Sequence, residues 1–169
     1  MNKSRKLLIA GGLALAIWGM GYGLYYALFD EHQTLERIGA SLTQGFAYAA
    51  ERNMPAAHAA LDAYAETKFE YVREVDVHSH WTGLALLLIV FGVVFDRVAF
   101  EERTRLVLAA MLAGGSVIFP LGVILQTLNQ SLLPKMIAVV GAGLLILSLG
   151  AVALGFYRNH ARARPPGNS

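Results

Sequence analysis

Four long apolar stretches constrain this chain more than any other feature of its sequence. They cover residues 7–29, 80–95, 106–126 and 133–157. A helix needs about 20 apolar residues to cross a bilayer core roughly 30 Å thick, and a helix satisfies all its backbone polar groups within one segment. Only 15% of the residues are charged, against about 25% in soluble domains. We therefore expect an all-α polytopic membrane protein with four transmembrane helices.

The lysines and arginines predict how these helices are oriented. Nine of them flank the ends that would share one side: Lys3, Arg5, Lys6, Arg97, Arg103, Arg105, Arg158, Arg162 and Arg164. The segment between the first two stretches is acidic instead, with nine of the twelve Asp and Glu residues at positions 30–76. Because basic residues collect on the cytoplasmic side, we expect both termini in the cytoplasm and residues 30–78 outside. In a bacterium this describes a multi-pass inner-membrane protein with a periplasmic segment.

The outer segment is predicted to form a helical hairpin. Its apolar residues recur at helical spacing at Leu35, Ile38, Leu42 and Phe46. Asn53 can then cap a new helix, and Pro55 suits the first turn of that helix. The second helix of the hairpin is expected to continue into the second span.

These boundaries divide the chain into four parts. Residues 1–29 form a cytoplasmic basic end and the first transmembrane helix, residues 30–78 the periplasmic hairpin, residues 79–157 transmembrane helices two to four, and residues 158–169 a disordered cytoplasmic tail. The run Ala14-Leu15-Ala16 resembles a signal-peptide cleavage site. However, the apolar stretch continues to Phe29, which favours an uncleaved anchor.

Small residues predict where the membrane helices approach one another. Pairs spaced four apart let two helix backbones come close together. The sequence contains three such pairs: Gly19 with Gly23, Ala110 with Gly114, and Ala151 with Gly155.

Polar residues at the start of the second span form the candidate site. Glu74 and His78 are four residues apart, as are Asp76 and His80, so each pair shares one face of a helix. The two histidines lie about 200° apart around a regular helix, which would turn only one of them inward. An extended backbone would instead let both bind one ion.

Imidazole suits haem iron, copper and zinc alike. For haem b, His32 just beyond the first span is the expected second axial ligand to His78 or His80. A copper or zinc ion would take His78, His80, Glu74 and Asp76. The alternative is that these residues bind nothing and lie at the boundary between lipid and water, where water satisfies them.

The histidine pair also carries a resemblance. His78-Ser79-His80 with Gly83 three residues on, followed by an apolar run to Phe95, resembles small bacterial four-span membrane proteins of unassigned function. Those proteins carry His-x-His at the outer start of the second span. By analogy with respiratory membrane subunits, the resemblance implies haem or metal binding.

Composition narrows the function classes. The chain has no cysteine, so disulfides and thiolate metal sites are excluded, and its net charge of +2 is too small to suggest nucleic acid.

No catalytic residues can be named, and we do not expect an enzyme on its own. The favoured function is a haem- or metal-binding electron-transfer or respiratory accessory subunit. The alternative is a cofactor-free assembly protein. Besides the lipid bilayer, expected partners are another membrane or periplasmic protein, docked through the hairpin, or a second copy of the chain.

Overall fold

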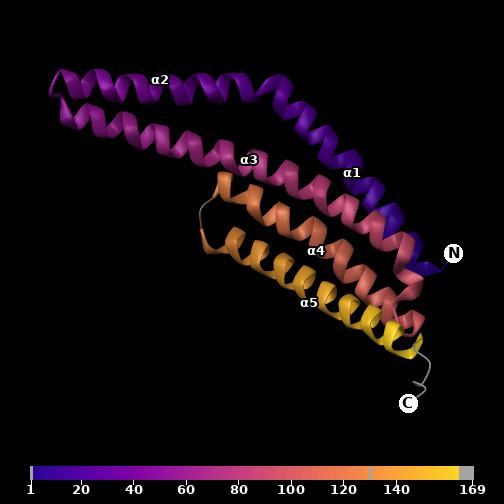
Figure 1. Ribbon diagram of the computed structural model, residues 1–169. Helices are drawn as coiled ribbons and strands as arrows, with labels where there is room; N and C mark the ends of the chain where they lie inside the picture. The colour runs from indigo at the N-terminus through magenta and orange to yellow at the C-terminus, as the bar shows by residue number, and fades with distance from the viewer. Residues whose placement is uncertain (1, 130, 164–169) are drawn as a thin grey trace, which may run out of the picture.

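The computed structural model describes residues 2–129 and 131–163, and that part of the chain is helical with no strand (Figure 1). The elements are α1 (Lys3–Phe29), α2 (Glu31–Ala50), α3 (Met54–Val94), the 3-10 helix η1 (Phe95–Arg97), α4 (Glu102–Leu128) and α5 (Leu132–Ala163). Four helices, α1, α3, α4 and α5, are long and apolar enough to cross a membrane. The predicted all-α chain with four helices of membrane length is confirmed.

Local sequence explains where α3 begins. The Asn53 side chain accepts a hydrogen bond from the backbone N–H of Ala56 at 3.3 Å, and Pro55 occupies the first turn. Arg52 adopts a positive φ of 61°, a left-handed conformation that reverses the chain between α2 and α3. Helix α3 then continues for 41 residues, about 60 Å at 1.5 Å per residue, which is about twice the thickness of a bilayer core.

The length of α3 produces a projection that we call the arm, residues 31–76. Here α2 and the first half of α3 lie side by side and antiparallel, and they extend beyond the ends of α4 and α5 (Figure 1). The start of α1 and the end of α5 lie at the opposite end of the molecule (Figure 1). Helix α5 continues to Ala163, so residues 158–163, predicted as a disordered tail, are helical. Residues 164–169 of that predicted tail lie outside the described residues.

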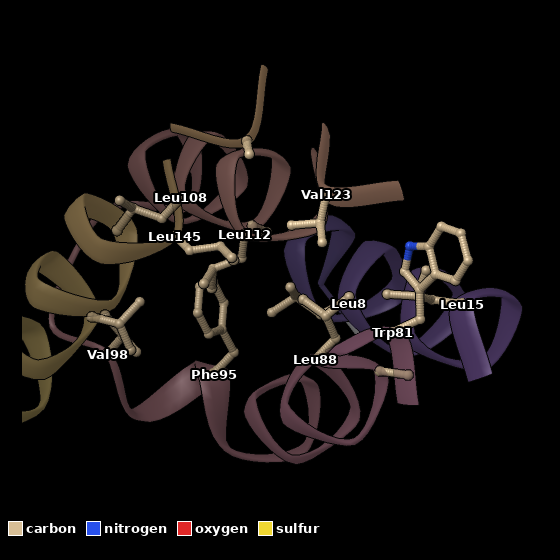
Figure 2. Close-up of a cluster of buried hydrophobic side chains, with 14 of the residues drawn as sticks. Leu8, Leu15, Trp81, Leu88, Phe95, Val98, Leu108, Leu112, Val123 and Leu145 are labelled. Carbon is tan, nitrogen blue, oxygen red and sulfur yellow. The ribbon is translucent and has the colours of Figure 1, made fainter. Parts of the chain in front are cut away.

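The membrane-length helices pack in a fixed order. Helix α3 packs on α1, α4 packs on both of them, and α5 packs on α4 and η1. Figure 2 shows the core, where Leu8 of α1, Leu88 of α3 and Leu112 of α4 are buried with Phe95 of η1. Large apolar side chains also cover the outside of these helices, for example Ile17, Leu24, Leu86, Ile146 and Leu147. Such an outer surface suits lipid rather than water.

Polar contacts hold the start of α1 against the α3–α4 connection. The Arg5 guanidinium lies 2.6 Å from the Asp96 carboxylate and also donates to the carbonyl of Gly92 at 3.0 Å. The buried Ser4 hydroxyl donates to Glu102 at 3.2 Å, and Arg105 pairs with the same carboxyl group at 3.1 Å. These contacts pair four charged residues at this end, Arg5 with Asp96 and Arg105 with Glu102.

Candidate functional site at the junction of α1 and α3

The two histidines of the predicted site belong to different packing surfaces. Helix α3 is regular through both positions, so the side chains diverge. His78 points to α1, where its Nδ1 lies 2.9 Å from the carbonyl oxygen of Gly19. His80 bonds through its own Nδ1 to the carbonyl of Asp76 at 2.6 Å, and its ring packs edge-on against Phe119 of α4 at 4.9 Å. The backbone is helical rather than extended, but both histidines pack on a neighbouring helix, whereas a regular helix was expected to turn only one of them inward.

The other predicted ligands separate in the same way. His32 lies on the surface of α2 with 86% of its side chain exposed and its Nε2 3.2 Å from Glu36. The Asp76 carboxylate lies 3.9 Å from Arg73. Over residues 2–129 and 131–163, no three His, Asp or Glu side chains are grouped closely enough to hold a metal ion. Only Glu74 and His78, of the five predicted site residues, line one pocket.

That pocket lies between α1 and α3 at the root of the arm and has a volume of about 240 Å³. We call it the junction pocket. Its lining residues are Gly23, Tyr26, Ala27, Glu31, Glu74, Val75 and His78. The chain folds this way because Gly23 has no side chain, so the His78 ring lies against the α1 backbone; a Cβ at that position would overlap the ring.

Hydrogen bonding assigns the state of the His78 ring. A carbonyl oxygen only accepts, so the bond to Gly19 places the ring proton on Nδ1. In the neutral imidazole, Nε2 is then an acceptor, and it lies on the far side of the ring from Gly19. This backbone bond fixes both the tautomer and the ring orientation.

One carboxyl group and one hydroxyl group of the junction pocket, those of Glu74 and Tyr26, are partly or fully buried. Burial raises the pKa of the Glu74 carboxyl above its ordinary value, since desolvation disfavours the charged form. Glu74 forms none of the ion pairs found among the described residues. The Tyr26 hydroxyl is buried beside the side chain of Thr34 on α2.

Three lining residues were missed as site residues at the sequence level: Gly23, Tyr26 and Glu31. The sequence feature that could have pointed to Gly23 is its four-residue spacing from Gly19, which equals the spacing of Glu74 and His78 on the facing helix. Glu31 precedes His32, so a choice between the two depended on the helix register after the bend at Asp30.

No protein-family model matches the chain, and neither a curated protein nor a solved structure matches it.

Proposed function

We propose that this protein is a docking protein of the bacterial inner membrane, with both termini in the cytoplasm. Its four membrane-length helices anchor it, and the arm, on the periplasmic side, binds a partner protein. The orientation rests on the distribution of lysine and arginine along the chain. The single observation that supports docking is an exposed apolar side on the arm.

The apolar side follows from helix geometry. Buried small or short residues mark the contact between the two helices: Thr34 and Gly45 on α2, and Ala57 and Ala60 on α3, with Gly45 against Ala57. At the same helical spacing, the half-buried Thr67 and Tyr71 continue this face of α3. One position later in each helix, about 100° around, come four large apolar residues, all at least two-fifths exposed: Leu35, Phe46, Leu61 and Val72. Because the helices are antiparallel, the same rotation in each carries these residues to the same side of the arm.

The opposite side of the arm is polar. One position before the contact residues stand Gln33 and Gln44 on α2, and Glu66 and Glu70 on α3. A two-helix arm with one apolar side has too little core to be stable by itself, and contiguous exposed apolar residues mark interaction surfaces. Phe46 is the most prominent of them, with 69% of its surface exposed.

Charge indicates the kind of partner. Residues 30–76 hold nine acidic and four basic residues, so the arm as a whole is acidic. Complementary potentials favour association and specificity. We therefore propose a partner protein that presents apolar residues surrounded by lysine and arginine.

Cross-linking in intact cells tests the docking proposal. Since the chain has no cysteine, Phe46→Cys and Val72→Cys each introduce a single thiol on the apolar side. A membrane-impermeant cross-linker that joins a thiol to an amine should then couple each variant to one discrete protein through the lysines of that protein. Immunoblotting and mass spectrometry of the purified adduct measure the result.

Matched thiols on the polar side are the control. Gln44→Cys and Glu66→Cys lie one position before the contact residues and should give little of the adduct. Adding Leu61→Glu to Phe46→Cys should remove the adduct, because a charge would be buried in the interface. Equal adducts from both sides, an adduct of two copies of the chain, or thiols that the impermeant reagent does not reach would each contradict the proposal.

The haem or metal ion predicted at His78 and His80 has its own test. An absorption spectrum and a metal analysis of the detergent-purified protein, made with ample haem and metals, would reveal a bound cofactor. Replacing both histidines by alanine should then abolish it. The fixed orientation of His78 is what favours this second role, in which its Nε2 would be the ligand.

A further inference from the structure

Helices α2 and α3 meet in the arm at positions that alternate three and four residues apart. Buried or half-buried residues recur at this spacing on α2 at Thr34, Ile38, Ser41 and Gly45. They recur in the same way on α3 at Ala57, Ala60, Tyr64, Thr67 and Tyr71. This is the heptad spacing of a coiled coil, in which each helix directs one continuous seam at its neighbour. The two helices therefore stay side by side along the arm.

The row of residues one position after each seam forms the apolar side of the arm. On α2 the row consists of Leu35, Gly39, Leu42 and Phe46, and on α3 it includes Leu61, Ala65 and Val72. Two contacts align the rows: a Cβ at Gly45 would lie 3.4 Å from the Leu61 side chain, and Tyr26 lies beside Thr34 with its ring 6.5 Å from that of Tyr71. The rows therefore run level with each other, with Phe46 opposite Leu61 and Leu35 opposite Val72.

The middle of the apolar side is open. A Cβ added at Gly39 would meet nothing within 4 Å. The α3 row also contains Lys68, whose ammonium lies 5.5 Å from the centre of the Tyr64 ring, so this side chain folds back along its own helix. A side chain from another molecule therefore has room between the two rows.

The fold disfavours two occupants other than a partner protein. Helix α3 runs without a break from Met54 to Val94 and includes a span of membrane length, so the arm extends away from the bilayer (Figure 1) and does not lie on the lipid surface. A second copy would bring together two arms that each hold nine acidic and four basic residues, and like charges held close together cost energy. A partner with basic residues is complementary to the arm.

The chemistry of the rows indicates which kind of partner segment fits. The rows present apolar side chains, and the backbone groups behind them are already bonded within α2 and α3. An extended segment laid on them would bury N–H and C=O groups that find no partner, which costs free energy. A helix satisfies its own backbone and presents an apolar face at the same three-and-four spacing.

We infer that the partner contributes one amphipathic helix, which lies between the two rows and completes a three-helix bundle with α2 and α3. This inference rests on the proposed docking function and names the element that docks. The α2 row extends about 16 Å from Leu35 to Phe46 at 1.5 Å per residue, so about three turns of the partner helix cover it. The outer face of that helix carries lysine and arginine, which complement the acidic arm.

Photo-cross-linking in intact cells tests the helix. The photoreactive residue p-benzoylphenylalanine, placed in turn at Leu35, Leu42 and Phe46, should couple to one continuous segment of the partner, and mass spectrometry maps the coupled residues. A helix covers the 16 Å from Leu35 to Phe46 in about 11 residues, whereas an extended strand covers it in about 5. The sites coupled from Leu35 and Phe46 should therefore lie about 11 residues apart, with the Leu42 site between them.

The outcomes distinguish the helix from docking itself. The same photoreactive residue at Gln44, on the polar side, is the control and should couple little. Coupled sites about 5 residues apart, or on separate segments of the partner, would overturn the helix while the docking function stands, because the adduct still forms. Coupling to lipid, to a second copy of the chain, or to no discrete protein would overturn both.

A synthetic peptide of the mapped segment provides a second measurement. It should bind the detergent-purified full-length protein and gain helical circular dichroism on binding. Gly39→Trp fills the open space without touching the seam and should weaken peptide binding by about tenfold or more, because a clash excludes the ligand. Gln44→Trp adds the same bulk on the polar side and should change the Kd by less than about twofold. A bound peptide without helical signal, or equal effects of the two variants, would contradict the inference.

Discussion

Replacing Gly141 by alanine is expected to lower the free energy of unfolding by about 1–3 kcal/mol, the range for overpacked interiors. Gly141 of α5 faces α4, and a Cβ there would overlap the backbone nitrogen and Cα of Phe119. Backbone atoms inside a helix cannot rotate away as a side chain does. The two helices must therefore separate, and the close contact that small residues permit is lost.

The matched control lies two residues away on the same helix. A Cβ at Gly143 would meet nothing within 4 Å, and alanine favours a helix over glycine by up to about 1 kcal/mol. Gly143→Ala should therefore be neutral or stabilising. Unfolding in mixed detergent micelles, followed by circular dichroism, measures both variants. Equal behaviour of the two variants would show that α4 and α5 do not meet at Gly141.

Spacing rules predicted close helix contacts but not always the correct face. Gly19, Gly23 and Gly155 do lie where a Cβ would press on a neighbouring helix or connection. Gly114 was expected in a contact, yet it faces open space, whereas Gly115 packs against Leu145 and the carbonyl of Gly141. One residue rotates the position by about 100° around a helix. With small residues at both positions, only the position of the neighbouring helix decides between them.

The candidate site was predictable within one helix and less so between helices. Glu74 and His78 were expected to share a helix face, and they line the same pocket. His32 was expected beside them, but the turn at Asp30 between α1 and α2 directs Glu31 toward the pocket and leaves His32 on the surface. Periodicity carries through a regular helix, whereas a bend resets it by an angle that depends on packing.

Trp81→Ala is expected to be the most destabilising single substitution near the junction pocket, by about 2–3 kcal/mol. Trp81 is 4% exposed, and its ring packs edge-on against Tyr22 at 5.2 Å and Trp18 at 5.8 Å (Figure 2 shows Trp81 beside Leu15). Truncating a buried tryptophan costs about 3–5 kcal/mol. Part of that is offset, because the buried Trp81 Nε1 has no hydrogen-bond partner and removing an unsatisfied donor returns about 1 kcal/mol or more.

Two variants distinguish the loss of packing around the buried Trp81 ring from the loss of its contact with Trp18. Trp18→Ala removes the same Trp18–Trp81 contact, but Trp18 is 60% exposed, so it leaves no cavity and should cost less than about 1 kcal/mol. Trp81→Phe keeps most of the ring and removes the unsatisfied donor, so its stability should lie close to that of the wild type. The same unfolding measurement ranks all three. If Trp18→Ala were as damaging as Trp81→Ala, the shared contact rather than the burial of Trp81 would stabilise the junction of α1 and α3.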